Sequence, residues 1–254
     1  MGTADHNATL ARPGVRRVGS GSDRQTRSVP MFGQSLMSMH SCQLDHLVIT
    51  APTLAAGLEW VEETLGVTPQ AGGDHQRMGT HNALLRLGDE TYLEVIAPNP
   101  AASRPDRPRW FELDRMAPDA APRLATWVAR TTDIQSATVS CSTELGEIET
   151  MNRGSLDWLI TIPPDGSLPG GGAFPTLIEW KTPEHPAARL VDRGCALSLV
   201  QLFYPAPNVL REVLACLGLA DARVAHETSP GTHPYVVAHI ETRHGPRELG
   251  IPGM

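Results

Sequence analysis

The chain has 254 residues, of which 41% are hydrophobic and 19% are charged, and this is the composition of an ordinary globular protein. Its formal net charge of −7 argues against a nucleic-acid partner, because proteins that bind a phosphate backbone usually carry a basic surplus. No stretch approaches the ~20 apolar residues of a membrane helix, so we expect no membrane association.

We expect residues 1–41 to form a disordered leader. The segment has few acidic residues and lacks the apolar core of a secretory signal peptide. Met31, Met37 and Met39 are alternative start sites, and a transit peptide is an alternative interpretation of the segment.

Residues 43–66 predict a strand, a capped helix and a glycine stop. Thr53 is a good N-cap residue, and Gly66 suits the left-handed turn that ends many helices. Apolar residues recur at helical spacing on one face, at Leu54, Leu58, Val61 and Leu65. We therefore expect this helix to pack one face on a sheet.

The same plan of strand, capped helix and glycine stop recurs twice. The second helix is expected between Asp133 and Gly146, and the third between Asn208 and Gly218. Self-similarity of this kind is typical of folds that repeat one structural unit.

Strand-like segments follow each helix, at 82–88, 91–97, 156–162, 176–181, 235–242 and, as a further candidate, 246–251. Repetition of a strand, a helix and more strands predicts an α+β layer structure. Helices would cover one face of the sheet, and the other face would curve around a cavity. Residues 99–122, rich in Pro, Arg and Asp, would connect the first two units, anchored by Trp110 and Phe111. An active-site lid is the alternative role for this connection.

The cysteines show none of the paired spacings of zinc ribbons or redox motifs: they are Cys42, Cys141, Cys195 and Cys216. A chain of this length does not need disulfides for stability. We therefore interpret them as reduced thiols of a cytoplasmic protein, with Cys141 and Cys216 buried on helices.

His46 and Glu94 each stand in the middle of an otherwise apolar strand. A lone polar group there is costly without a partner, and both residue types are good ligands for a divalent metal. In the alternative interpretation, His46 is a histidine satisfied by the backbone. The carboxylates of Glu94 and Glu179 would then be solvated or would pair with Arg86, Arg130 or Lys181.

Three segments, LDHLVITAP, THNALLRLGDETYLEVIAP and FPTLIEWKTPEHPAARL, resemble the vicinal-oxygen-chelate superfamily, and most closely its glyoxalase-like domain proteins. The resemblance covers residues 43–190. It implies an α+β fold in which repeated βαβββ units form a curved, partly open, antiparallel or mixed sheet with helices on its outer face. It also implies a domain over 42–190 with units at 42–98 and 124–185, followed by a third, degenerate βαβ-type unit at 191–254.

In this superfamily the metal ligands come from the first and last strands of each unit. The matching positions here are His46 and Glu94 in the first unit and Glu179 in the second. The fourth position holds Thr126, a poor ligand for most divalent metals. By the same resemblance, Glu179 is the expected catalytic base. If the third unit closes the site instead, the alternative candidates are Gln201 and Glu248.

The resemblance implies a metal-dependent enzyme that acts on a small vicinal-oxygen substrate as an isomerase, lyase or dioxygenase. The cofactor would be a divalent metal, one of Mn, Fe, Ni, Zn or Mg. One alternative is a metal-free protein of the same fold that binds or sequesters a small molecule, and a buried Arg130 facing Glu94 would indicate it. Another alternative is a dimerisation module with an empty cavity. The third unit would pack beside the first two or pair with a partner chain in a homodimer.

Overall fold

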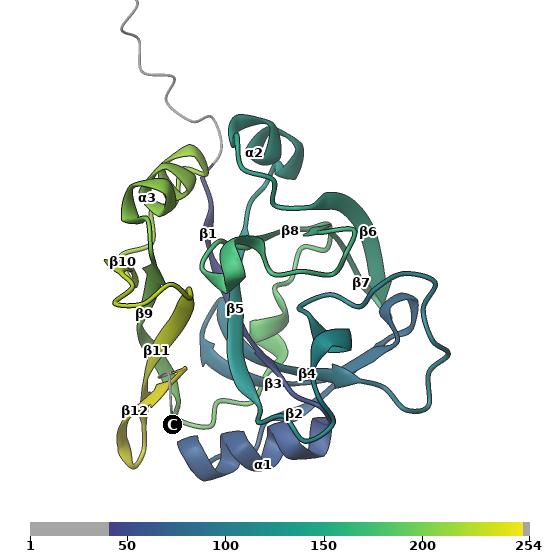
Figure 1. The fold of residues 1–254 in the computed structure, drawn as a ribbon. Coiled ribbons are helices and arrows are strands. Elements are labelled where there is room, and N and C mark those ends of the chain that lie inside the picture. The colour runs from purple at the N-terminus through teal and green to yellow at the C-terminus, as the bar shows by residue number, and fades with distance from the viewer. Residues whose placement is uncertain (1–40, 251–254) are drawn as a thin grey trace, which may run out of the picture. The chain divides into compact units, whose positions relative to one another are not determined.

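The computed structural model describes residues 41–250 and has the α+β architecture shown in Figure 1. The predicted leader, residues 1–41, lies outside the described residues except at its last position. One sheet has eight strands and a second has four. The predicted fold class, with repeated units that build a mixed sheet, is confirmed. None of the helices in the described part of the chain is long and apolar enough to cross a membrane.

The elements follow the order strand, helix and three strands three times. The first set is β1 (Gln43–Thr50), α1 (Leu54–Leu65), β2 (Gln70–His75), β3 (Thr80–Gly88) and β4 (Thr91–Pro98). The second set is β5 (Arg123–Arg130), α2 (Ile134–Ser140), β6 (Glu147–Arg153), β7 (Leu156–Ile162) and β8 (Thr176–Trp180). The third set is β9 (Ala196–Tyr204), α3 (Pro207–Cys216), β10 (Val224–Thr228), β11 (Tyr235–Thr242) and β12 (Gly245–Leu249). Short 3-10 helices lie at Gln76–Met78, Leu113–Arg115, Pro169–Gly172 and Pro186–Arg189.

The first two sets share the large sheet, whose strand order is β2-β3-β4-β1-β5-β8-β7-β6. In each set the first strand pairs in parallel with the last, and β1 pairs antiparallel with β5 at the centre. The third set forms its own sheet, in the order β10-β9-β11-β12 (Figure 1). There the first strand pairs in parallel with the second strand of the set, so the third set repeats the order of elements but not their pairing.

Three strands were not expected from the sequence: β2, β6 and β10. All three lie at an edge of their sheet. Their residues are mostly exposed or half-buried, so they lack the apolar pattern by which strands are recognised.

Residues of the central strand β1 contribute to cores on both faces of the large sheet. Leu47 and Ile49 pack on the helix side, in the same core as α1 and most of the third set. Val48 packs on the opposite side, with Ile96 and Trp158. The second face carries the candidate site.

Helix α1 begins and ends as predicted. The Thr53 hydroxyl accepts a hydrogen bond from the Ala56 N–H at 3.2 Å, and Gly66 adopts a left-handed φ of 72°. Helix α3 differs, because its N-cap is Ala206 rather than Asn208. Pro207 occupies the first helical position, where its fixed φ is already helical and its missing N–H costs nothing.

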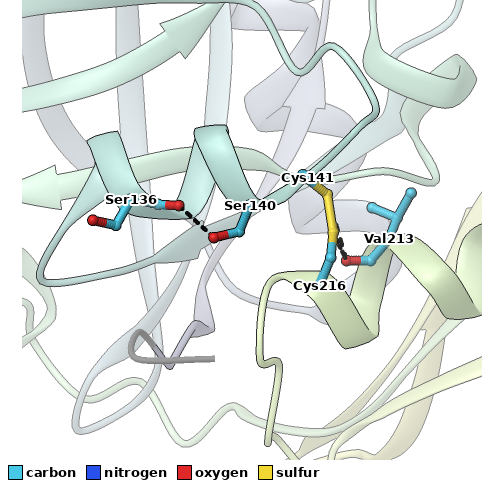
Figure 2. The surroundings of a disulfide bond; sticks show 5 residues. All are labelled: Ser136, Ser140, Cys141, Val213 and Cys216. Atoms are coloured by element: carbon cyan, nitrogen blue, oxygen red, sulfur yellow. Dashed lines mark hydrogen bonds between the residues drawn. A yellow bond between two sulfur atoms is a disulfide. The ribbon is translucent and has the colours of Figure 1, made fainter. Parts of the chain in front are cut away.

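Helix α2 ends at Ser140, well before the predicted stop at Gly146. Its sequence, IQSATVS, is rich in residues of low helix propensity. The Ser140 hydroxyl also donates to the Ser136 carbonyl at 2.8 Å, and this type of bond competes with helix formation (Figure 2).

A disulfide joins the end of α2 to the end of α3, between Cys141 and Cys216 (Figure 2). The interpretation of these two residues as reduced thiols is therefore wrong. The sequence could not reveal this pair, because the two cysteines are 75 residues apart and meet only through tertiary packing. The other two cysteines, Cys42 and Cys195, are free and buried.

Candidate functional site

The site begins with a β-bulge in β1. Leu44 pairs with Ala129 and His46 pairs with Val128, so Asp45 is an extra residue with no partner on β5. Adjacent side chains of a regular strand point to opposite faces, but a bulge redirects them. Here Asp45 and His46 meet, with Asp45 Oδ1 2.6 Å from His46 Nδ1.

Asp45 is fully buried and joins three side chains. Besides His46, it accepts hydrogen bonds from Trp180 Nε1 at 2.9 Å and from His185 Nε2 at 3.0 Å. Burial alone would raise the pKa of Asp45, but the hydrogen bonds from His185 and His46 outweigh it and hold this pKa well below its ordinary range. Asp45 is therefore a carboxylate, and a carboxylate only accepts, so the nitrogen of each histidine that faces it must donate.

The other ring nitrogen of His46 faces Glu94. His46 Nε2 lies 3.6 Å from Glu94 Oε2, and both side chains are buried. Strand β4 delivers Glu94 beside β1, its parallel neighbour in the sheet. The second carboxylate oxygen, Oε1, accepts a hydrogen bond from the Asn82 amide on β3. The carboxylate is thus fixed from one side and faces the imidazole on the other.

Aromatic rings enclose this pair. The His46 ring stacks on Tyr92, with ring centroids 4.4 Å apart. We call the enclosed space the inner pocket. It is lined by His46, His75, Asn82, Tyr92, Glu94, Trp110, Phe111, Arg153, Trp158, Ile160, Ile178 and Trp180. Its volume of about 30 Å³ is enough for a water molecule or a small ion.

Arg153 enters the inner pocket from the end of β6. Its Nη1 donates to Asn82 Oδ1 at 2.9 Å and lies 3.3 Å from His75 Nε2. Burial of His75, together with the positive charge of Arg153, lowers the pKa of His75 from 6.5 to about 3. His75 is therefore neutral at pH 7, so its Nε2 can accept from Arg153 while Nδ1 donates to Thr80 Oγ1 at 3.2 Å.

The structure brings together two of the three predicted site residues, His46 and Glu94, but not Glu179. The Glu179 carboxylate accepts from the Ile134 N–H at 3.0 Å and pairs with Lys181. Because side chains alternate along a strand, the neighbours of Glu179 on β8, Ile178 and Trp180, line the inner pocket in its place. The ion pair with Lys181 is one of the alternatives that the sequence offered for Glu179.

The remaining candidates lie elsewhere. Thr126 is buried and its hydroxyl donates to the Gly172 carbonyl at 3.1 Å. Arg130 pairs with Glu90, not with Glu94. The alternative ligands Gln201 and Glu248 belong to the second sheet, where His239 bridges them at 2.6 and 3.1 Å.

A metal ion would find two ligands in the inner pocket. His46 Nε2 and Glu94 Oε2 are a nitrogen and an oxygen donor on one wall, and Asp45 holds the imidazole in orientation by accepting from its other nitrogen, Nδ1. Within residues 41–250, however, no group of three or more His, Cys, Asp or Glu side chains is arranged to hold a metal. The donor set therefore fits a divalent ion only in part.

Sequence reasoning missed Asp45, His185, Trp180 and Arg153. A signal existed for Asp45, an acidic residue inside the apolar strand LDHLVIT. A signal also existed for Trp180 and His185, which lie within the family-like segment FPTLIEWKTPEHPAARL. Nothing in the sequence marks Arg153, because it lies at the end of an edge strand that was itself not predicted.

Comparison with solved structures finds similar folds. A hypothetical protein from Staphylococcus aureus is similar over 83% of this chain and 85% of its own, with a TM-score of 0.50 and 14% identity. A methylmalonyl-CoA epimerase variant of Streptomyces coelicolor in complex with 2-nitronate-propionyl-CoA matches 55% of this chain and 97% of its own, with a TM-score of 0.38 and 17% identity. The epimerase of Mycobacterium tuberculosis matches 54% of this chain and 85% of its own, with a TM-score of 0.35 and 18% identity. At 14% identity the likeness to the Staphylococcus aureus protein concerns the fold alone.

No curated protein matches the chain. The model of a protein family described as "Glyoxalase-like domain" matches residues 44–218, which is more than half of the chain. The chain therefore belongs to the glyoxalase-like domain family, within the vicinal-oxygen-chelate superfamily, and is an enzyme or a small-molecule-binding protein of this broad group.

Proposed function

We propose that the protein is an enzyme that moves a proton on a small oxygenated molecule, with Glu94 as the base. The observation that carries this proposal is the buried pair of His46 Nε2 and Glu94 Oε2, 3.6 Å apart in a pocket with aromatic walls. In its neutral form, the imidazole donates Nδ1–H to Asp45 and keeps a lone pair on Nε2. The imidazole and the carboxylate then face the same point as two acceptors, an arrangement suited to receiving a proton or a metal ion.

The proposed step is the removal of a proton from a carbon next to a carbonyl group. The C–H bond breaks, its electron pair moves onto the carbonyl oxygen as an enolate, and the Glu94 carboxylate takes the proton. Return of the proton to the same carbon completes an epimerisation. Where that carbon carries a hydroxyl group, transfer of the hydroxyl proton to the enolate oxygen, with return of the first proton to the neighbouring carbon, completes an isomerisation. The Asn82 amide holds the carboxylate in position throughout.

Glu179 was the base expected from the sequence, and we propose Glu94 in its place. Glu179 is tied to the start of α2 and to Lys181, and it does not line the inner pocket. A general base must come within hydrogen-bond reach of the proton that it removes. Glu94 meets that requirement for a molecule bound beside His46.

If a divalent metal serves as the cofactor, His46 and Glu94 are the residues that would hold it. When bound there, the ion would polarise the oxygens of the substrate. The third predicted ligand, Glu179, faces away, so water and substrate would have to fill the remaining positions. Mass spectrometry of the purified protein tests this: about one divalent ion per chain, lost in both His46→Ala and Glu94→Ala, would support a metal site. No bound ion after reconstitution with Mn²⁺, Fe²⁺, Ni²⁺, Zn²⁺ or Mg²⁺ would refute it.

The activity itself is tested by hydrogen–deuterium exchange of small oxo compounds in D2O, followed by NMR. We expect enzyme-dependent exchange at the carbon next to the carbonyl group. Glu94→Gln should slow the exchange by about 10²–10⁴-fold, the usual contribution of a general base. Exchange at the uncatalysed rate with every compound offered would refute the proposal.

A second candidate function is binding or sequestration without a metal. It is favoured by the two-residue donor set and by the cationic Arg153 in the same pocket. Saturable binding of small molecules, with no exchange and no bound ion, would support it.

The cytoplasmic location predicted from the sequence rested on reduced thiols. Disulfides persist mainly in oxidising compartments, so the Cys141–Cys216 bond does not support that reasoning, and the location stays a prediction. The homodimer also stays a prediction, which light scattering of the purified protein would test.

A further inference from the structure

Arg153 stands apart from the other arginines by its surroundings. Within residues 41–250 it is the one half-buried arginine with no carboxylate within 4.0 Å. Its recorded hydrogen-bond partners, Asn82 and the neutral His75, carry no charge. The fold therefore places this guanidinium without the directly paired carboxylate that normally accompanies a buried arginine, since Glu94 of the same pocket does not pair with it.

The donors of Arg153 are mostly unused. Both recorded contacts of the side chain involve Nη1, and within the described residues Nε and Nη2 have no acceptor. Two parallel N–H groups of a guanidinium match the two oxygens of a carboxylate. Gly73 leaves room for the Arg153 side chain, since a Cβ on Gly73 would come within 2.9 Å of Arg153 Cδ.

Trp110 supplies an independent observation in the same pocket. Its side chain is only 4% exposed, and its buried Nε1 has no hydrogen-bond partner. A buried N–H without an acceptor is costly, so this N–H is a donor that the oxygen of a ligand could satisfy in place of a water molecule. The indole lies edge-on to His75, the residue that also contacts Arg153.

The inner pocket adjoins an outer groove, formed by residues 74–77 and 150–154, with a volume of about 420 Å³. The two spaces share His75 and Arg153. A ligand held by Arg153 would therefore lie at the junction, with one part beside His46 and Glu94 and the remainder in the groove.

We propose that the bound molecule, which reaches from the outer groove into the inner pocket, carries a carboxylate, which Arg153 binds through two hydrogen bonds with a further donor from Trp110. This inference rests on the proposed function and names its substrate class as small oxo or hydroxy acids. A singly charged carboxylate suits the pocket better than a phosphate dianion does, because Glu94 lies in the same small space and repels negative charge.

The test is calorimetric binding of pyruvate, glyoxylate, lactate and glycolate to the full-length protein, with methyl pyruvate as the neutral counterpart of pyruvate and inorganic phosphate as a separate arm. We expect at least one acid to bind saturably. Methyl pyruvate should bind at least about tenfold more weakly than pyruvate. Arg153→Met should weaken binding of the acid by about tenfold or more, and Arg153→Lys should restore only part of it, because lysine lacks the planar fork.

Two further variants keep the test decisive. Glu94→Gln should tighten binding of the acid, because it removes a negative charge from the pocket, even while it stops proton exchange. Arg211→Met is the matched control: Arg211 is an exposed arginine on α3 whose recorded partner is the neutral Asn208, and its loss should leave binding unchanged.

The proposal is overturned if none of the four acids binds, if methyl pyruvate binds as well as pyruvate, or if Arg153→Met binds the acid like the wild-type protein. Binding of phosphate in place of the acids would also overturn it, in favour of a phosphorylated ligand. Exchange that depends on Glu94 but not on Arg153 would leave the proposed function standing and refute this inference alone.

Discussion

His75 should make the protein sensitive to mild acid. The side chain is 4% exposed, and its folded-state pKa is about 3 against an ordinary value of 6.5. Burial is the first cause, followed by the positive charge of Arg153 and by the nearby His46 and His81. As the pH falls below 6.5, the unfolded chain takes up a proton at His75 that the folded protein refuses. The stability from this residue is thus complete above pH 6.5 and is lost as the pH falls toward 3.

The magnitude follows from the proton uptake. Each pH unit below 6.5 costs about 1.4 kcal/mol for one proton taken up only by the unfolded state. Between pH 7 and pH 5 the relevant interval is 6.5 − 5, or about 1.5 units, so His75 accounts for a loss of about 2 kcal/mol.

The comparison variant is His75→Gln, whose amide can donate to Thr80 and accept from Arg153 but does not titrate. Urea unfolding of both proteins at pH 7 and pH 5 gives the free energies of unfolding. We expect the wild-type protein to lose about 2 kcal/mol more than the variant across this interval. Parallel losses in the two proteins would refute the reasoning, since all other titrating groups are common to both.

Asp45→Asn should lower the free energy of unfolding by about 3–5 kcal/mol in urea titrations, because it removes the buried charge that three donors share; a change under about 1 kcal/mol would contradict the role of Asp45. Reduction of the Cys141–Cys216 disulfide, which spans 75 residues, should cost about 4 kcal/mol in the same assay. The reductant should have no effect on the Cys141→Ser/Cys216→Ser double variant, and an equal effect on both proteins would point to another target. Gly72→Ala should cost about 1–3 kcal/mol by thermal melting, because the new Cβ would lie 2.0 Å from the amide oxygen of the pocket asparagine. Gly231→Ala, with nothing within 4 Å of its Cβ, is the control, and equal melting temperatures for the two variants would contradict the predicted clash.

The elements predicted most accurately are those in which buried residues recur at the spacing of a helix or a strand. Helix α1 has the predicted cap and glycine stop, and of its predicted apolar stripe Val61 and Leu65 are buried. Strands β7 and β11 occupy the predicted residues 156–162 and 235–242. The edge strands were missed because exposed residues carry no such pattern. The predicted start of α3 was wrong because the fixed φ of Pro207 overrides the cap signal of Asn208. The predicted end of α2 was wrong because hydrogen bonds from hydroxyl groups to the backbone override the stop signal of Gly146.

A residue of the candidate site could be predicted only where the residue's own place in its strand was enough to identify it. His46 and Glu94 stand out because each is a lone polar residue in an apolar strand, and the structure places them together. Glu179 is also a lone polar residue in an apolar strand, but whether its side chain points into the pocket depends on which residues of β8 face inward. Asp45 depends on a bulge, and Arg153 reaches the pocket from the far edge of the sheet. Both follow from strand register, which a single sequence does not fix.

Proton exchange in D2O by the wild-type protein, Glu94→Gln and Glu179→Gln tests the central claim most directly. The three proteins would be compared by NMR on the small oxo acid that binds best. The account predicts that Glu94→Gln loses enzyme-dependent exchange while Glu179→Gln keeps it, because only Glu94 faces His46 in the inner pocket. Loss of exchange in Glu179→Gln, with activity retained in Glu94→Gln, would contradict the account.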